Sequence, residues 1–160
     1  MKLSRRLQAI YDELKPGVPV ADICCDHGYL GAHAYLSKKF PEIIFIDQVK
    51  ETMIQLETKF EQFVRDDEIE TSVNFITADA RKVRVPFSGN VVLAGVGGKN
   101  MMEMLEGLFQ SPDFKPARLI LSPHRNPELY EKSQLFGLPF SHSNQVTEAD
   151  VTSPIFVFSA

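Results

Sequence analysis

Aspartates stand at the ends of three successive apolar segments, and carboxylates in that pattern can hold a ligand through hydrogen bonds. Asp22 and Asp26 lie at the end of the first segment, Asp47 ends the second, and Asp79 follows the third. The carboxyl ends of parallel strands share one edge of an open α/β sheet, which is where such sheets bind ligands. A single acid after a strand is often only a turn former. Acids after three strands in register favour a site for a nucleotide-like cofactor.

The loop after the first apolar segment has an unusual composition for such a site. It reads Cys24-Cys25-Asp26-His27-Gly28, whereas cofactor loops at this position are usually rich in glycine. Cys24 and Asp26 stand where two of those glycines are expected, so the dinucleotide fingerprint G-x-G-x-x-G is absent. A tight backbone turn still brings N–H and C=O groups close to a small zwitterion. We therefore expect the loop to contact the amino-acid part of a cofactor.

Each of the other acids has a separate expected task. Asp47, with Gln48 beside it, is placed to accept hydrogen bonds from two ribose hydroxyls. Asp79 is placed to accept one from an adenine amino group, with the backbone N–H of Ala80 nearby. Asp22 is expected to hold the loop in shape by accepting hydrogen bonds from backbone N–H groups of the loop.

Other nucleotide and metal chemistries are not indicated. The stretch Gly97-Gly98-Lys99 lacks the upstream glycine and the following Ser or Thr of a phosphate-binding loop. The four histidines are scattered and do not have the spacing of a zinc site, so we predict no bound metal. The two cysteines are adjacent, which predicts reduced thiols rather than an ordinary disulfide.

Length and composition are those of one globular domain spanning residues 1–160. The net charge of −4 argues against a surface dominated by nucleic-acid contacts, which is normally basic. No segment has the roughly 20 apolar residues that a membrane span needs, so no membrane partner is expected. The basic N-terminus lacks the apolar stretch of a signal peptide, and we expect a cytoplasmic protein.

The elements that must position these residues alternate between strand and helix. Helical spacing of apolar residues predicts helices over about 3–14, 29–39, 49–63 and 101–108. Apolar runs predict strands over 18–24, 43–47, 73–76, 90–94 and 118–121. Asn100 and Glu103 are expected to form a capping box at the start of the fourth helix. A short helix from Asn126-Pro127 to Gly137 and a C-terminal antiparallel hairpin complete the order.

This order predicts a fold class. Alternating strands and helices imply a mostly parallel sheet with helices on both faces. Such a sheet closed by a hairpin is the architecture of the class I, S-adenosylmethionine-dependent methyltransferases, an inference by analogy of fold alone. We therefore predict a Rossmann-like α/β domain with a seven-stranded sheet, preceded by an N-terminal helix within residues 1–15.

Four sequence motifs follow one another in the order found in a known family. They are Leu3–Leu7 (LSRRL), Val20–Leu30 (VADICCDHGYL), Ala94–Gly98 (AGVGG) and Leu119–Pro123 (LILSP). They resemble the patterns LSKRL, VADIGSDHAYLP, AGMGG and LILQPN of the bacterial tRNA (adenine-22, N1)-methyltransferase family, at similar intervals. The resemblance spans about residues 3–125. Its most specific part is the Asp-His-x-Tyr-Leu loop together with the Gly-x-Gly-Gly loop.

Membership of that family implies S-adenosylmethionine as methyl donor and N1 of a tRNA adenine as acceptor. The loop of Gly95, Gly97 and Gly98 would then lie beside the reacting methyl group. The cofactor-binding residues expected on this basis are Asp22, Cys24, Cys25, His27, Gly28, Asp47, Gln48, Asp79, Ala80 and Gly95.

Asp26 and Tyr29 are the expected catalytic residues. Adenine N1 is already nucleophilic, so the useful help is a carboxylate that takes a proton from the 6-amino group or stabilises the cationic product. Asp26 is assigned that role and Tyr29 a stacking or positioning role, with His27 orienting the loop. Asp26 can instead cap the helix that follows. The expected substrate contacts are Arg5, Arg6, Gly97, Gly98, His124 and Arg125.

The sequence also departs from the family. The family's Gly-Ser pair is Cys24-Cys25 here, and its polar pair after the fifth strand is replaced around Ser122 and His124. The family's C-terminal helical, coiled-coil extension has no counterpart in these residues. Two other functions therefore stay open: a class I methyltransferase acting on another acceptor, and a degenerate cofactor-binding domain used only for interaction.

Overall fold

The computed structural model describes residues 2–63 and 69–160, and the strands within them form one mixed sheet. Across the sheet the order is β3-β2-β1-β4-β5-β8-β7-β6. The first five strands run parallel, and the last three are added antiparallel. The strands are β1 (Val20–Ile23), β2 (Glu42–Asp47), β3 (Ser72–Thr77), β4 (Asn90–Ala94), β5 (Arg118–Ser122), β6 (Gln134–Leu135), β7 (Leu138–Glu148) and β8 (Val151–Ser159).

The predicted fold class, a Rossmann-like and mostly parallel sheet with a C-terminal antiparallel hairpin, is confirmed. The predicted number of strands is wrong, because the sheet has eight strands rather than seven. The additional strand, β6, has only two residues, which pair with β7 across a tight turn. Phe136 and Gly137 form that turn and both have positive φ. The prediction that Gly137 ends a helix is therefore wrong, because the short helix η1 ends at Tyr130.

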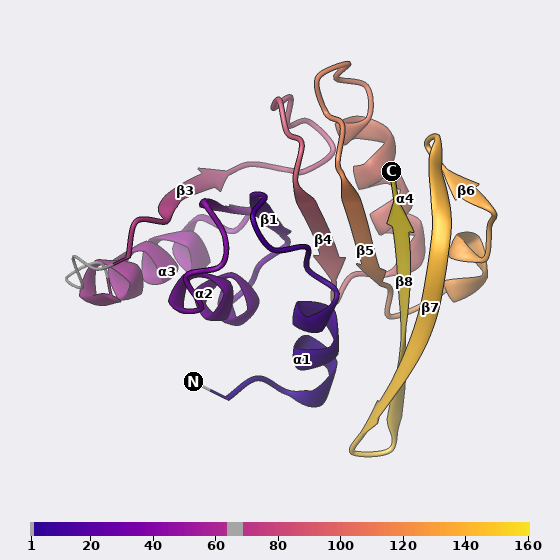
Figure 1. Cartoon of the computed structure of the whole chain (residues 1–160), viewed down its shortest axis with the longest axis horizontal. Coiled ribbons are helices and arrows are strands. Elements are labelled where there is room, and N and C mark those ends of the chain that lie inside the picture. Colours follow the sequence, from indigo (N-terminus) through magenta and orange to yellow (C-terminus); the bar gives the residue numbers. More distant parts are fainter. Residues whose placement is uncertain (1, 64–68) are drawn as a thin grey trace.

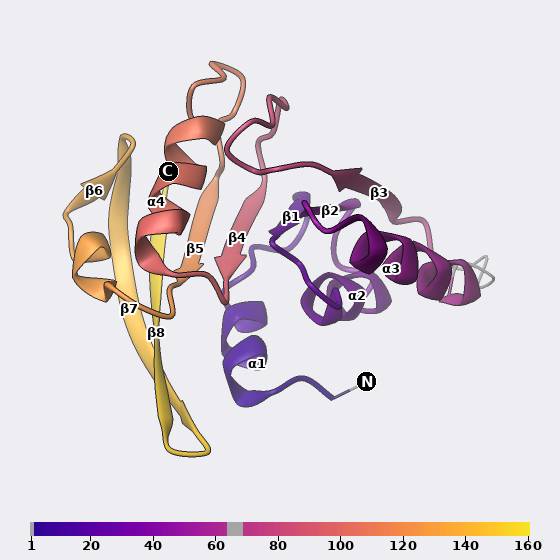
Figure 2. The ribbon, with the colours of Figure 1, turned by 180° about the vertical axis from the view of Figure 1, so that it is seen from behind.

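Helices cover both faces of the sheet, as predicted. The helices α1 (Arg5–Asp12), α2 (Tyr29–Leu36) and α3 (Lys50–Phe63) pack on one face, and Figure 1 shows them together. The helix α4 (Gly98–Leu108) and the 3-10 helix η1 (Pro127–Tyr130) pack on the other, where Figure 2 shows α4 in front of β5 and β8.

The central strands are buried on both faces. In β4, Val91 and Leu93 belong to the core under α4, whereas Val92 belongs to the core under the other three helices. Successive side chains of a strand point to opposite faces, so a strand covered on both sides has to be apolar throughout. This is why the buried strands read as short apolar runs in the sequence.

The helix α3 is the amphipathic helix that the apolar spacing predicts. Met53, Leu56 and Phe60 are buried against the sheet. Val49, where the predicted helix was expected to begin, precedes α3 and is 49% exposed. Phe63 ends the helix, and its side chain lies outside the described part of the chain.

The predicted capping box at the start of α4 is wrong. The helix begins at Gly98, with Gly97 in the capping position, and Asn100 lies inside the first turn. The backbone N–H of Met101 already donates to the carbonyl of Gly97, at 2.9 Å. The chain can turn into the helix directly after β4 because a glycine at 98 packs against the Arg125 carbonyl, which a Cβ would meet at 2.3 Å.

The helix α1 connects the N-terminus to the hairpin strands. Ser4 caps the helix by accepting a hydrogen bond from the backbone N–H of Leu7, at 3.2 Å. Glu13, just after the helix, binds Arg118 of β5 at 2.7 Å and His142 of β7 at 2.8 Å. The β7–β8 hairpin extends beyond the other strands along α1, and Figure 1 shows this projection clearly. The contacts of Glu13 fix where the end of α1 lies relative to the sheet.

Candidate active site

A cavity of about 290 Å³ lies at the carboxyl edge of the sheet, where β1, β4 and β5 end. Polar and apolar groups line it in similar proportion, and they come from the start of α1, the β1–α2 loop, the end of β4 and the loop after β5. The lining residues are Arg6, Leu7, Asp22, Cys24, Cys25, Asp26, His27, Tyr29, Leu30, Ala94, Gly95 and His124.

The β1–α2 loop keeps the backbone of a glycine-rich turn with fewer glycines. Cys24, Asp26 and Gly28 all have positive φ, of 58°, 49° and 71°. Glycine adopts this region at no steric penalty and Asp tolerates it, but a cysteine there stores strain of about 1 kcal/mol or more. The backbone N–H of Cys24 donates to Ile46 at 2.7 Å, and its Sγ lies 3.6 Å from Sδ of Met104. The loop is therefore tied to β2 and to α4.

Asp22 is the buried carboxylate of the cavity, only 6% exposed. It accepts a hydrogen bond from the backbone N–H of Gly31 at 3.1 Å, so it holds the first turns of α2 rather than the loop amides. Burial raises the pKa of Asp22 to about 7, with a smaller contribution from the Asp47 charge and against the effect of the Gly31 hydrogen bond. A carboxylate in that position attracts a cation or a hydrogen-bond donor.

Asp47 supports the loop from the end of β2. Its Oδ2 accepts the backbone N–H of Asp26 at 3.2 Å, and its Oδ1 accepts that of Val49 at 3.0 Å. An ionised carboxylate has about four acceptor positions, so room remains for hydroxyl donors. Asp47 is half-buried and Gln48 beside it is exposed, but neither lines the cavity itself.

Asp79 forms an ion pair with Arg81 that was not predicted from the sequence. Arg81 binds it with Nε at 3.0 Å and Nη2 at 3.0 Å, and also reaches Glu103 at 3.3 Å. These hydrogen bonds from Arg81 hold the pKa of the Asp79 carboxyl below its usual range. Asp79 and the buried Ala80 lie outside the cavity. The arginine two residues after Asp79 in the sequence could have indicated this ion pair.

Asp26, His27 and Tyr29 are exposed at the mouth of the cavity. The carboxylate of Asp26 lies 3.8 Å from Nε2 of His27, and the rings of His27 and Tyr29 are 5.6 Å apart. The N-cap of α2 is Gly28, with no side-chain cap hydrogen bond, so the alternative that Asp26 caps this helix is wrong. Lys59 of α3 lies 5.4 Å from the centre of the Tyr29 ring. These groups are free to meet a ligand.

Gly95, Arg6 and His124 lie next to one another in the lining of the cavity. A Cβ on Gly95 would lie 3.7 Å from Nε2 of His124 and 3.8 Å from Nη2 of Arg6. Of the other expected substrate residues, Arg5 and Arg125 are exposed outside the cavity lining. Gly97 has open space around its Cα, whereas Gly98 is buried against the Arg125 backbone.

The apolar side chains that line the cavity were not predicted from the sequence. Leu7, Leu30 and Ala94 contribute to the cavity, and nothing in their residue type distinguishes them from core positions. Leu7 belongs to the LSRRL motif and Leu30 to the cofactor-loop motif, so their motif membership was the only available signal.

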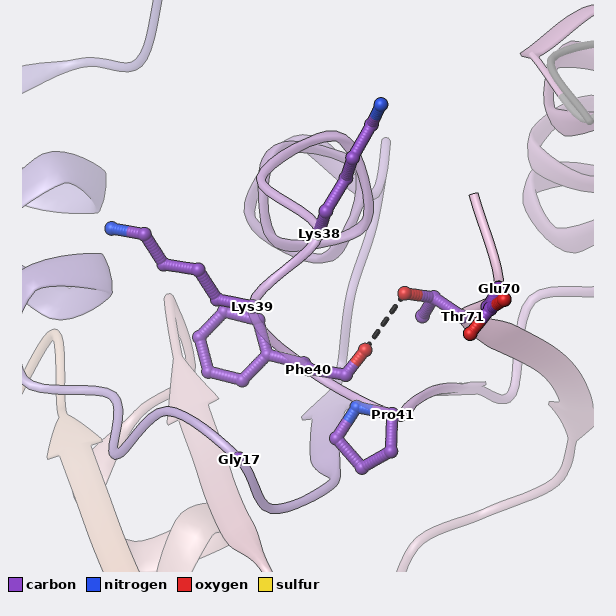
Figure 3. Close-up of a pocket in the computed structure, with 7 residues that line it drawn as sticks. All are labelled: Gly17, Lys38, Lys39, Phe40, Pro41, Glu70 and Thr71. Carbon is purple, nitrogen blue, oxygen red and sulfur yellow. Dashed lines mark hydrogen bonds between the residues drawn. The ribbon is translucent and has the colours of Figure 1, made fainter. Parts of the chain in front are cut away.

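A larger hollow of about 450 Å³ lies at the other edge of the sheet, where β1, β2 and β3 begin. Figure 3 shows that the side chains of Lys38 and Lys39 point away from each other. The hydrogen bond drawn there joins the Thr71 hydroxyl to the Phe40 carbonyl at 2.7 Å. No polar side chains converge in this hollow, unlike the cavity at the carboxyl edge.

No group of metal-ligating side chains occurs within residues 2–63 and 69–160. Over the same residues, no helix is both long and apolar enough to cross a membrane.

Comparisons with known proteins agree with this geometry. A family model described as a methyltransferase domain matches residues 3–134, and no curated protein matches the sequence. TrmK from M. capricolum, in complex with S-adenosyl-homocysteine, has a TM-score of 0.81 at 17% identity, over 99% of this chain and 69% of that one. The m1A22 tRNA methyltransferase TrmK from B. subtilis has a TM-score of 0.77 at 21% identity, over 99% and 67%.

A third solved structure shares the fold but is a methyltransferase for a different substrate. It is the magnesium protoporphyrin IX methyltransferase from Synechocystis PCC 6803 with bound S-adenosyl-homocysteine. Its TM-score is 0.73 at 12% identity, over 97% of this chain and 81% of that one. At these identities the likenesses establish the fold.

Proposed function

The chain belongs to the methyltransferase domain family, and we propose that it transfers a methyl group from S-adenosylmethionine to N1 of an adenine in tRNA. Two likenesses support this choice of donor and acceptor. The M. capricolum TrmK structure contains S-adenosyl-homocysteine, which is what the donor becomes after transfer. The B. subtilis TrmK is described as an m1A22 tRNA methyltransferase. We place the reaction in the cytoplasm, where tRNA is available.

The charge of the cavity fits the donor. S-adenosylmethionine carries a sulfonium, an ammonium and a carboxylate group, and is cationic overall. The carboxylates of Asp22, Asp26 and Asp47 lie in or against the β1–α2 loop. A buried carboxylate is unfavourable unless it is paired. An ammonium group in the cavity would offset the cost of burying Asp22. The observation that carries the proposal is this buried carboxylate with a raised pKa, lining a cavity at the carboxyl edge of the sheet.

The residues that would hold the donor follow from their positions. Asp22 and the backbone of the β1–α2 loop would hold its amino-acid part, and Asp47 its ribose hydroxyls. Asp79 shares its carboxylate with Arg81 and is therefore the weakest of the expected contacts to adenine. When bound, the donor supplies an electrophilic methyl group on a sulfonium.

The protein's own groups have a limited chemical task. Transfer forms a bond between N1 and the methyl carbon as the bond from sulfur to that carbon breaks. Since adenine N1 is already nucleophilic, alignment and exclusion of water are the main requirements. The exposed Asp26 carboxylate would accept a proton or a hydrogen bond from the 6-amino group and offset the positive charge that develops on the base. Tyr29, 46% exposed, offers a ring on which the base can stack.

A methyl-transfer assay tests this function. The full chain is incubated with S-adenosylmethionine labelled in the methyl group and with unmodified tRNA, and the label is then followed. We expect label in the tRNA, and less of it at low donor concentration when Asp47→Ala replaces the wild-type chain. Label in protein or in small molecules, with unlabelled tRNA, would overturn the proposed acceptor. Absence of any donor binding in calorimetry would overturn the proposed donor.

A further inference from the structure

Arg6 and His124 come together in space although 118 positions separate them in the sequence. Arg6 is in the first turn of α1, and His124 follows β5. Both reach the same point over Gly95, at the end of β4. A Cβ built there would lie 3.7 Å from Nε2 of His124 and 3.8 and 4.0 Å from the two terminal nitrogens of Arg6. Two donor groups from different elements therefore face one small region of the cavity.

Position 95 places only a bare Cα beneath these two side chains, and a Cβ there would already be in van der Waals contact with both. Gly95 has φ +77°, which favours glycine for conformational reasons. Its backbone N–H donates to the Ser122 carbonyl at 3.2 Å, and the N–H of His124 donates to the Val96 carbonyl at 2.9 Å. These two hydrogen bonds fix the loops after β4 and β5 against each other. The position of His124 beside Gly95 is therefore built into the backbone.

Arg6 is the arginine of the cavity lining, and its charge has no carboxylate partner among the described residues. By contrast, Arg81 binds Asp79 and Glu103, and Arg118 binds Glu13. Within the described part of the chain, no carboxylate makes an ion pair with Arg6 or with His124. A half-buried guanidinium without a carboxylate partner, beside a histidine in the lining of a cavity, is suited to bind an anionic oxygen.

We propose that Arg6 and His124 together bind a phosphate group of the acceptor nucleotide over the bare Cα of Gly95. This proposal rests on the proposed function and adds to it a preference for an acceptor that carries a phosphate. The acids of the β1–α2 loop suit the cationic donor, whereas Arg6 and His124, from other elements, suit the anionic backbone of the acceptor. The site then selects a nucleotide within RNA over a free adenosine, because only the nucleotide brings a phosphate to Arg6 and His124.

Arg5 does not share this role, although it is adjacent in the sequence. Its side chain is exposed outside the cavity, and its backbone N–H donates to the Glu148 carboxylate at 3.2 Å. The helical turn sends the side chains at positions 5 and 6 in different directions, so only one of them reaches Gly95.

Binding of tRNA in the presence of S-adenosyl-homocysteine tests the proposal. Fluorescence anisotropy is measured at several salt concentrations for the full chain and for Arg6→Gln, His124→Gln and the double variant. Lys39→Gln at the opposite edge of the sheet (Figure 3) is the charge-matched control. Arg6→Lys retains the charge, and thermal melting checks that each variant is folded.

We expect Arg6→Gln and His124→Gln each to weaken tRNA binding by about tenfold or more, since each removes a hydrogen bond to a charged group. The double variant should lose less than the product of the two, because both side chains hold one phosphate. For Arg6→Gln, the slope of log affinity against log salt concentration should also be shallower by about one, because one phosphate contact is lost. Arg6→Lys should recover part of the affinity, and Lys39→Gln should behave as the wild type.

Two failures can be told apart in this experiment. If the wild type binds and methylates tRNA while folded Arg6→Gln and His124→Gln behave like Lys39→Gln, the phosphate site is refuted and the proposed function stands. If the wild type binds S-adenosyl-homocysteine but no tRNA, the proposed acceptor and the phosphate site both fail.

Discussion

Replacing Asp22 by Asn tests the electrostatics of the cavity. The pKa of Asp22 is raised from 3.8 to about 7 because the carboxylate is buried. In the unfolded chain the same group ionises near its ordinary pKa. Since the folded state holds this proton more tightly, the stability from Asp22 is fully present below about pH 4 and is lost as pH rises towards 7.

The size of the effect follows from the two pKa values. One pKa unit corresponds to about 1.4 kcal/mol, so a shift of about three units is roughly 4 kcal/mol at pH 7. At pH 5 the loss of stability is only about 2 kcal/mol, because pH 5 lies only about one unit above the pKa of Asp22 in the unfolded chain. Asp22→Asn cannot ionise, and its carbonyl oxygen can still accept the Gly31 N–H.

Urea denaturation at pH 5 and at pH 7 measures this difference. The free energy of unfolding of Asp22→Asn, relative to the wild type, should rise by about 2 kcal/mol between the two pH values. Asp26→Asn is the matched control, because its exposed carboxylate is hydrated in both the folded and the unfolded chain. A stability difference for Asp22→Asn that is the same at both pH values would refute the assigned burial energetics.

Three further substitutions separate donor binding, catalysis and packing. Asp47→Ala should weaken S-adenosyl-homocysteine binding by about tenfold or more in calorimetry, through lost hydrogen bonds and a loosened loop; unchanged binding would contradict its role. Asp26→Asn should lower kcat on tRNA by about a hundredfold with donor affinity retained, and equal activity would exclude it from the chemistry. Gly31→Ala should lower thermal stability by roughly 1–3 kcal/mol, because its Cβ would stand 2.3 Å from the Phe45 ring; an unchanged melting temperature would show that the ring can move.

Much of the fold could be predicted from the sequence because its cues are local. Apolar runs and helical spacing predicted the strands up to β5 and the helices that precede β1, β2, β3 and β5. The elements that depend on tertiary contacts were predicted less well. The strand β6 exists because Gln134 and Leu135 meet β7, and α4 begins at Gly98 because that glycine fits against a distant carbonyl. Neither contact has a signal within its own segment.

The candidate site shows the same division. That Asp22, Asp26 and Asp47 meet at one edge follows from the parallel topology, and the sequence predicted it. Which oxygen of each acid is still available depends on pairing in three dimensions, as the ion pair between Asp79 and Arg81 shows. The backbone conformation of the β1–α2 loop could not be predicted either, because residue type does not indicate that Cys24 has a positive φ.

Nucleoside analysis of a methylated tRNA tests the central claim most directly. An unmodified tRNA is incubated with the full chain and S-adenosylmethionine, digested to nucleosides and examined by mass spectrometry. The proposed function predicts 1-methyladenosine as the product, formed in proportion to enzyme and about a hundredfold more slowly by Asp26→Asn. A different methylated nucleoside, or a tRNA that gains no methyl group while the protein binds the donor, would contradict it.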